Sequence, residues 1–259
     1  MSVVSSSSST WIWELQGLSM EDIRFFVLSL PHQVKKRAYV FGNMHTQGIP
    51  PKQVTLHQAN SGFKYPTSQS IIEAAKDTGF NFSGRENWRK FMLTYTWDVC
   101  EILRAVAENT YEENYYIFLE DDRILMRDYV SLKIICEYLD SDNKLLIFQM
   151  FYKHADEYNS LINTVPFDAE INVNPSGHCL AAFLFTKKGA AFLLEEILNN
   201  ENLKIHKSIE FLPYYLKGEG IFSVKQHNSY IRHMKTEYFQ DEKMDFQDGA
   251  LLRKHQGAS

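Results

Sequence analysis

Apolar runs of strand length alternate with segments of helical period along this chain, and this alternation constrains its fold more than any other feature. Continuous apolar runs at Phe25–Leu30 and Tyr115–Leu119 are typical of strands covered on both faces. Between them, the apolar residues from Trp88 to Val106 keep a helical spacing for about five turns. Because strands that alternate with helices form mostly parallel sheets, the sequence predicts an α/β, Rossmann-like single domain with helices flanking a central sheet.

The same patterns predict further elements and the limits of the domain. Helices are expected at 34–44, 129–139, 187–199 and 208–217, and strands at 53–57, 145–148, 180–185 and 221–226. Polar, Asn-rich sequence at 151–178 predicts a long loop that binds or covers something. The serine-rich stretch at 1–20 is interpreted as a flexible leader, 21–240 as the domain and 241–259 as a tail.

Composition excludes several classes of protein. The chain carries 27 Lys and Arg against 32 Asp and Glu, a net charge of −5, whereas proteins that bind nucleic acid normally carry a basic excess. Three scattered cysteines without a CxxC pair argue against a disulfide framework and against a structural zinc site. The longest apolar runs, of about seven residues, are too short for a signal peptide or a membrane span. We therefore expect a cytoplasmic protein with no membrane span and no nucleic-acid partner.

Three consecutive carboxylates, Glu120, Asp121 and Asp122, follow the strand at Tyr115–Leu119 directly. Ligands of open α/β sheets bind beyond the carboxyl ends of the strands, so these side chains are expected at a binding site. A hard divalent cation relieves the repulsion between adjacent carboxylates and commonly bridges to nucleotide phosphates. The alternative is a solvated acidic turn that Arg123 and Arg127 partly neutralise.

Four segments of the chain resemble glycosyltransferase family 25. Phe25–Pro31 with Arg37 looks like the opening FVISLPxxxxR of that family, and Tyr115–Ile124 looks like its EDD block. Val54–Gly62 and Cys179–Leu194 are similar to its xxAxxG segment and to its late strand and helix. The family's GExGcxxSH segment has no counterpart, so the resemblance implies a divergent branch of microbial or large-DNA-virus type.

The resemblance implies a GT-A-like glycosyltransferase with a donor half at about 21–150 and an acceptor half at about 151–240. It implies transfer of a sugar from a nucleotide diphosphate sugar, with a UDP-sugar favoured, to a glycan or other hydroxyl acceptor, with inversion. Mn²⁺ or Mg²⁺ would stabilise the departing diphosphate.

Roles for individual residues follow from the resemblance. Asp122, Glu120 and His227 are the predicted metal ligands, and His233 is the substitute for His227. Glu210 is the predicted catalytic base, at the start of a helix where a carboxylate is favoured. Asp168, in the long loop, competes with Glu210 for that role.

The predicted donor site uses the ends of the first strands. Its residues are Leu30, Arg37, Ala59, Asn60, Glu120 and Asp121. Arg85 and Arg89 form a second basic group near the donor by family analogy, whereas Trp88 fits the core.

Two other functions are consistent with the fold class. A nucleotidyltransferase would normally carry a Gly- and Lys-rich phosphate loop near the first strand, and Ser29–His32 is not such a loop. A non-catalytic carbohydrate-binding or scaffold domain is also open, because a fold does not determine function.

Overall fold

The computed structural model describes residues 22–108, 110–126, 128–140, 147–149, 171–172, 180–216, 221–224 and 231–233. Within them, seven strands form one sheet in the order β2-β1-β3-β7-β5-β8-β6. These strands are β1 (Ile23–Ser29), β2 (Val54–Gln58), β3 (Tyr115–Glu120), β5 (Ile147–Gln149), β6 (Ile171–Asn172), β7 (Ala182–Phe185) and β8 (Ile221–Val224). β1, β2, β3, β5 and β8 run in one direction, and β6 and β7 run in the other. The predicted α/β fold with a mostly parallel sheet is confirmed.

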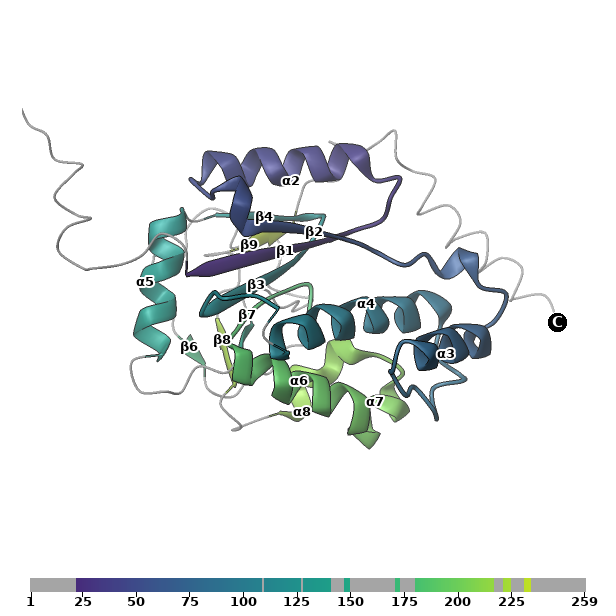
Figure 1. Cartoon of the computed structure of the whole chain (residues 1–259). Helices are drawn as coiled ribbons and strands as arrows, with labels where there is room; N and C mark the ends of the chain where they lie inside the picture. Colours follow the sequence, from purple (N-terminus) through teal and green to yellow (C-terminus); the bar gives the residue numbers. More distant parts are fainter. Residues whose placement is uncertain are drawn as a thin grey trace, which may run out of the picture.

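Helices cover both faces of the sheet (Figure 1). The α-helices are α2 (Val34–Thr46), α3 (Ser68–Asp77), α4 (Lys90–Ala107), α5 (Tyr129–Asp140), α6 (Lys187–Asn199), α7 (Glu201–His206) and α8 (Leu212–Tyr215). Short 3₁₀ turns lie at η1 (Pro51–Gln53), η2 (Gly62–Lys64) and η3 (Ile209–Phe211). α2 lies on one face, whereas α4 and α6 lie on the opposite face (Figure 1). No helix in this part of the chain is long and apolar enough to cross a membrane.

The core is divided into two halves by the sheet, and successive residues of β1 alternate between them. Phe26 and Leu28 belong to the half under α3, α4 and α6, whereas Phe25 and Val27 belong to the half under α2 and α5. All four side chains are at most 6% exposed. Burial on both faces explains why this strand reads as a continuous apolar run.

The chain order places a topological switch point between β1 and β3. β1 pairs in parallel with β2 on one side and with β3 on the other. α2 connects β1 to β2 over one face, and α3 and α4 connect β2 to β3 over the opposite face. Ligands of open α/β sheets bind outside the carboxyl ends of the strands at such a point. There Leu28 of β1 is level with His57 of β2 and with Glu120 of β3.

Several elements differ from the sequence-based expectation. A separate two-stranded sheet, β4 (Arg123–Leu125) with β9 (Ile231–His233), was not predicted, and neither was α3. The predicted loop at 151–178 contains the short strand β6, and its other residues lie outside the described ones. The helix predicted at 208–217 is the 3₁₀ turn η3 followed by the single turn α8. Residues 1–20 and 241–259, the predicted leader and tail, also lie outside the described residues.

Candidate functional site

The acidic turn, Glu120–Asp122, lies at the switch point between β1 and β3. The backbone N–H of Glu120 donates to the carbonyl of Ala181 at 3.0 Å, and that of Asp121 donates to the carbonyl of Leu28 at 3.1 Å. Asp121 is buried, with 8% of its surface exposed. The turn is therefore fixed by backbone hydrogen bonds to β1 and to the residue before β7.

Arg123 neutralises part of the acidic turn. Its Nη1 lies 2.8 Å from Oδ1 of Asp122, and its Nη2 donates to Oε2 of Glu120 at 3.2 Å. Arg123 is itself buried, whereas the two carboxylates it contacts are partly exposed. The turn is thus not simply a solvated loop, and Arg127, the other cation expected to neutralise it, lies outside the described residues.

The acidic turn keeps an excess of negative charge despite Arg123. Burial raises the pKa of Glu120 to about 7, Arg123 opposes the rise, and the nearby charges of Asp122 and Glu210 add to it. Glu210, predicted from sequence as the catalytic base, therefore lies near Glu120. Burial is the main reason that Glu120 holds its proton, and the charges of Asp122 and Glu210 would also favour a cation bound nearby.

Glu210 lies in η3, which begins after Ser208. The side chain of the buried Ser208 accepts a hydrogen bond from the backbone N–H of Glu210 at 3.1 Å. The Ser-x-Glu pattern thus does begin a helical turn, although the turn is of the 3₁₀ type. The competing base, Asp168, lies outside the described residues.

The two-stranded sheet brings the C-terminal strand to the acidic turn. Arg123 of β4 is the pairing partner of His233 of β9. β4 is held from α2, because Asn43 both donates to the carbonyl of Leu125 and accepts from its N–H, at 3.0 and 2.7 Å. His233, the substitute metal ligand, thus lies on the strand beside the acidic turn, whereas His227 lies outside the described residues.

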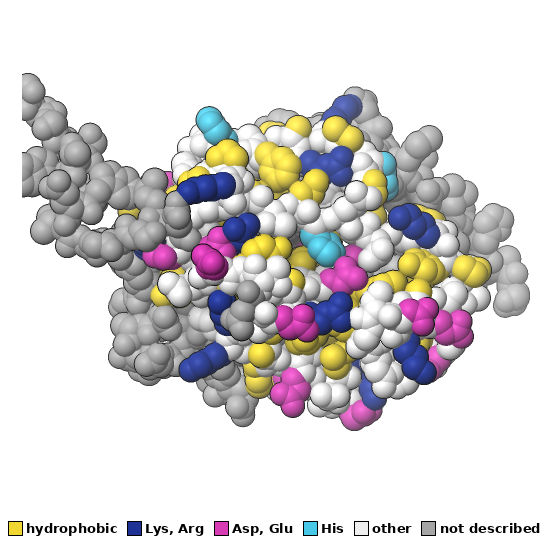
Figure 2. All heavy atoms as spheres, in the orientation of Figure 1, with side chains coloured by type: hydrophobic (Ala, Val, Ile, Leu, Met, Phe, Trp, Pro, Cys, Tyr) yellow, Lys and Arg dark blue, Asp and Glu magenta, His cyan; other side chains and the backbone are white. Residues whose placement is uncertain are grey.

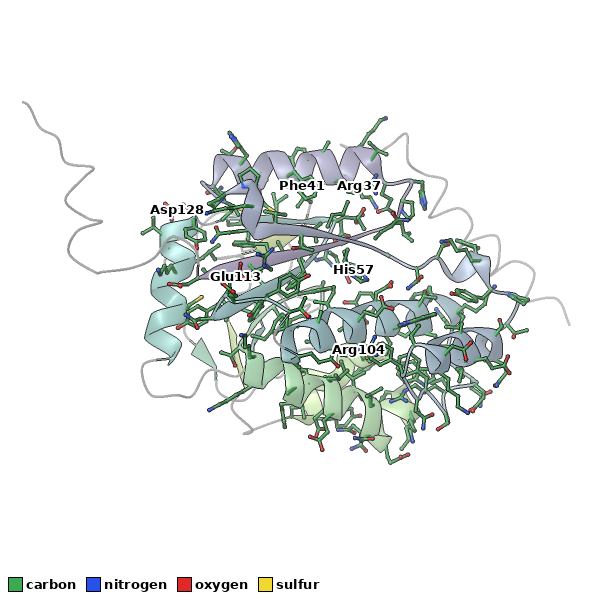
Figure 3. All side chains as sticks on the ribbon, in the orientation of Figure 1. Arg37, Phe41, His57, Arg104, Glu113 and Asp128 are labelled. Carbon is green, nitrogen blue, oxygen red and sulfur yellow. The ribbon has the colours of Figure 1, made fainter. Side chains whose placement is uncertain are left out.

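Two residues predicted to bind the donor make hydrogen bonds at the ends of β1 and β2. Arg37 donates to the carbonyls of Leu30 and Pro31, both at 2.9 Å, and so closes the turn between β1 and α2 (Figure 3). The N–H of Ala59 donates to Ser29 of β1 at 2.9 Å. These contacts give Arg37 a structural use, and its contact with a phosphate stays a prediction.

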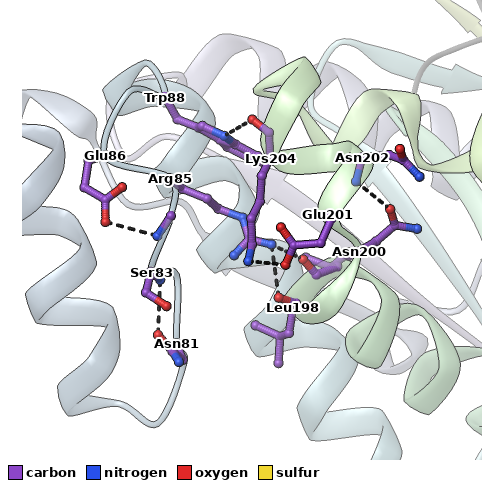
Figure 4. A network of polar contacts seen from close by, with 12 residues as sticks. Asn81, Ser83, Arg85, Glu86, Trp88, Leu198, Asn200, Glu201, Asn202 and Lys204 are labelled. Atoms are coloured by element: carbon purple, nitrogen blue, oxygen red, sulfur yellow. Dashed lines mark hydrogen bonds and ion pairs between the residues drawn. The ribbon is translucent and has the colours of Figure 1, made fainter.

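Arg85, the other cation expected near the donor, serves the fold. It is fully buried and donates to the carbonyls of Ile197 and Leu198 at the end of α6 (Figure 4). Its guanidinium also lies 5.2 Å from the ring centre of Trp88, which is buried as the sequence indicates. Helix carbonyls at a C-terminus lack partners within the helix, so Arg85 satisfies α6 rather than facing a ligand.

A second cluster of chemical groups was missed by the sequence analysis. His57 Nε2 lies 3.6 Å from Asp98 Oδ1 and 3.4 Å from Glu101 Oε2, both on α4. Among the described residues, this is the one set of three His, Cys, Asp or Glu side chains whose ligand atoms all lie within 4.8 Å of one another. We call it the α4 cluster. Its signal in the sequence is Asp98, which interrupts the apolar positions Trp97 and Val99 of a buried helix.

Asn60 orients the carboxylate of the α4 cluster. Its backbone N–H donates to both oxygens of Asp98, at 3.1 and 3.0 Å, and its side-chain amide donates to Oδ1 at 2.7 Å. The loop after β2, where the donor is predicted to bind, is therefore attached to α4. Burial lowers the pKa of His57, but the carboxylates of Asp98 and Glu101 outweigh that effect and raise the pKa to about 9.

Comparison with known proteins finds similarity at the level of solved structures. The chain is similar to the galactosyltransferase LgtC in complex with donor and acceptor sugar analogues, with a TM-score of 0.45 and 10% identity over 88% of this chain and 95% of that one. It is similar to a glycosyltransferase involved in glycosylation of the major capsid of PBCV-1, with a TM-score of 0.42 and 10% identity over 86% and 98% of the two chains.

A further solved structure with similarity is residues 1–349 of TarS from S. aureus, with a TM-score of 0.38 and 12% identity over 85% of this chain and 62% of that one. No family model matches the sequence, and no curated protein matches it. At this level of similarity the function has to be argued from the chain's own residues.

Proposed function

We propose that this chain is a metal-dependent glycosyltransferase that moves a sugar from a nucleotide diphosphate sugar, with a UDP-sugar as the first candidate, to a hydroxyl acceptor. The observation that carries the proposal is the position of the acidic turn at the carboxyl end of β3, beside the switch point between β1 and β3. That is where α/β folds bind nucleotides. The four segments that resemble glycosyltransferase family 25 specify the class of reaction.

The residues around the acidic turn suit a divalent cation. Arg123 contacts the carboxylates of Glu120 and Asp122, and the charges of Asp122 and Glu210 add to the effect of burial on the pKa of Glu120. Arg123 contacts Oδ1 of Asp122, and the carboxylate of Asp122 is the candidate ligand. His233 pairs with Arg123 through the backbone of β9, and it stays the substitute for His227. When bound, Mn²⁺ or Mg²⁺ would stabilise charge on the departing diphosphate.

The chain's own groups would perform the remaining steps. Glu210 would accept the proton of the acceptor hydroxyl as its oxygen attacks the sugar carbon opposite the leaving diphosphate, which inverts that centre. Its closeness to the acidic turn supports this role, because donor and acceptor must meet there. Asp121, buried behind the turn, would hold the backbone in place.

Asp122→Ala tests the cation site. We expect Mn²⁺-dependent thermal stabilisation of the wild type by at least one member of a panel of nucleotide sugars, and loss of that stabilisation in Asp122→Ala. If no nucleotide sugar stabilises the wild type with or without metal, the proposal fails. If stabilisation persists in Asp122→Ala, the acidic turn is not the metal site.

Glu210→Gln tests the reaction. Donor-dependent stabilisation should persist, and the rate of slow donor hydrolysis or of sugar transfer should fall by about 10²–10⁴-fold, the usual contribution of a general base. Glu195→Gln, on the exposed surface of α6, is the matched control and should keep full activity. Binding of nucleotide sugars without any turnover by the wild type would instead identify a non-catalytic binding domain.

A further inference from the structure

The distances within the α4 cluster are longer than a direct charge-assisted hydrogen bond, and they match the spacing of metal ligands. A charge-assisted hydrogen bond between imidazolium and carboxylate spans about 2.7–2.9 Å. Nε2 of His57 lies 3.6 and 3.4 Å from Asp98 and Glu101, and it makes no hydrogen bond to any described residue. Two ligand atoms that each lie about 2.05 Å from a tetrahedral ion are about 3.4 Å apart. Both distances from Nε2 are therefore close to the edge of such a tetrahedron.

The carboxylate of Asp98 is held in the way that metal ligands commonly are. It is 1% exposed, and Asn60 fixes both of its oxygens with hydrogen bonds from backbone and side chain. Such outer partners orient a ligand before the ion arrives. The side chain of Glu101 is 29% exposed, so it has room to turn and bring its carboxylate to the ligand spacing from Asp98, which is the third edge of the tetrahedron.

The cluster is reached from one face of the molecule. Figure 3 places His57 between β2 and α4. Figure 2 shows histidine and acidic atoms at the surface near the middle of the same face. One imidazole and two carboxylates are ligands that first-row divalent ions such as Zn²⁺ accept. The scattered cysteines argue against a cysteine-based zinc site, whereas this set offers nitrogen and oxygen ligands.

We propose that His57, Asp98 and Glu101 form a second divalent-cation site, of the zinc class, which is separate from the acidic turn and joins the end of β2 to α4. The ion would hold the loop that carries Asn60 against α4. This site does not depend on the proposed glycosyltransferase activity. Its test needs no nucleotide or sugar.

The test is a titration of the chelator-treated full chain with Co²⁺, read by visible absorption, followed by competition with Zn²⁺. It is performed in the Asp122→Ala background, so that the acidic turn does not contribute. We expect one ion per chain in a tetrahedral or five-coordinate spectrum that Zn²⁺ displaces. Absence of Co²⁺ and Zn²⁺ binding in this background overturns the proposal.

Variants assign the ion to its ligands. His57→Gln and Glu101→Gln should each weaken Co²⁺ binding by about tenfold or more, since even outer partners of metal ligands change affinity by about 10–100-fold. Glu101→Gln is the safer of the two for folding because its side chain is partly exposed. His45→Gln, on the exposed face of α2, is the matched control and should bind Co²⁺ as its parent does. Equal affinity in His57→Gln and in the control overturns the assignment.

Discussion

The acidic turn and the α4 cluster lie on the same edge of the sheet, and they balance their carboxylates in different ways. In the acidic turn, buried Arg123 contacts both Asp122 and Glu120 and carries a charge at every accessible pH. In the α4 cluster, the facing group is His57, whose charge depends on pH and on bound ions. The acidic turn therefore has a permanent cation, the side chain of Arg123. In the α4 cluster the positive charge is exchangeable, because it depends on the protonation of His57 or on a bound metal ion.

This difference has a structural origin. Arg123 follows the acidic turn on β4, so that one short segment supplies both signs of charge. The α4 cluster combines the end of β2 with one face of α4, and the two are joined only because the helix crosses the sheet there. A local pair is set by the chain itself, whereas the second cluster depends on tertiary packing.

The largest effect is expected from removing the permanent cation. Arg123→Met should lower the free energy of unfolding at pH 7 by about 3 kcal/mol, because breaking a buried pair leaves uncompensated charge. The loss should shrink as the pH falls below about 7, because Glu120, with a pKa of about 7, then takes up a proton. Urea unfolding of the wild type and of Arg123→Met at several pH values measures the loss of stability and its dependence on pH.

The control for this prediction is an exposed ion pair. Lys204 lies 2.6 Å from Glu201, whose side chain is 75% exposed, so Lys204→Met should cost only about 0.3 kcal/mol. A loss in Arg123→Met as small as that of the control would mean that the acidic turn is neutralised by other groups.

The contribution of His57 to the free energy of unfolding should depend on pH in the opposite direction. With no metal ion bound, burial lowers the pKa of His57, but Asp98 and Glu101 outweigh burial and raise the pKa to about 9, above the value of 6.5 that an unfolded histidine has. Its stabilisation is therefore complete below pH 6.5 and is lost as the pH rises through 9. Each unit of pKa difference corresponds to about 1.4 kcal/mol, and solvent screening at this partly exposed side chain reduces the expected total to about 2 kcal/mol.

His57→Gln removes the stabilisation that comes from the charge on His57. Between pH 6 and 10 the wild type should lose stability relative to His57→Gln, and the difference is measured by urea unfolding in chelator. The pKa of His57 can be read independently from its imidazole NMR signals. A difference that does not change over this pH range would show that Asp98 and Glu101 do not hold the histidine charged.

The fold could be predicted from sequence because its signals are local. Burial on both faces makes β1 and β3 continuous apolar runs, and α4 shows its helical period over its whole length. The short strands β4 and β9 were missed because three residues carry too little pattern to distinguish them from a loop.

The candidate site could be predicted in part. The position of the acidic turn after β3 follows from strand order alone, and Arg123 was recognised as its neighbour in the sequence. The structural uses of Arg37 and Arg85 were not visible, because their backbone acceptors belong to a turn and to a distant helix. The α4 cluster was missed for the same reason, since no spacing rule connects His57 to Asp98.

The smallest effect is expected from the outer partner of the α4 cluster. Asn60→Ala removes one hydrogen bond to the carboxylate of Asp98 and keeps the two from its backbone N–H, so the free energy of unfolding should fall by about 1 kcal/mol. Asn81→Ala, which removes the acceptor for Ser83 N–H in an exposed turn, is the control and should cost less. The double variant Asn60→Ala with His57→Gln decides whether the two residues act through Asp98 together. Coupling of about 0.5 kcal/mol or more in urea unfolding supports one connected cluster, and strict additivity would separate Asn60 from it.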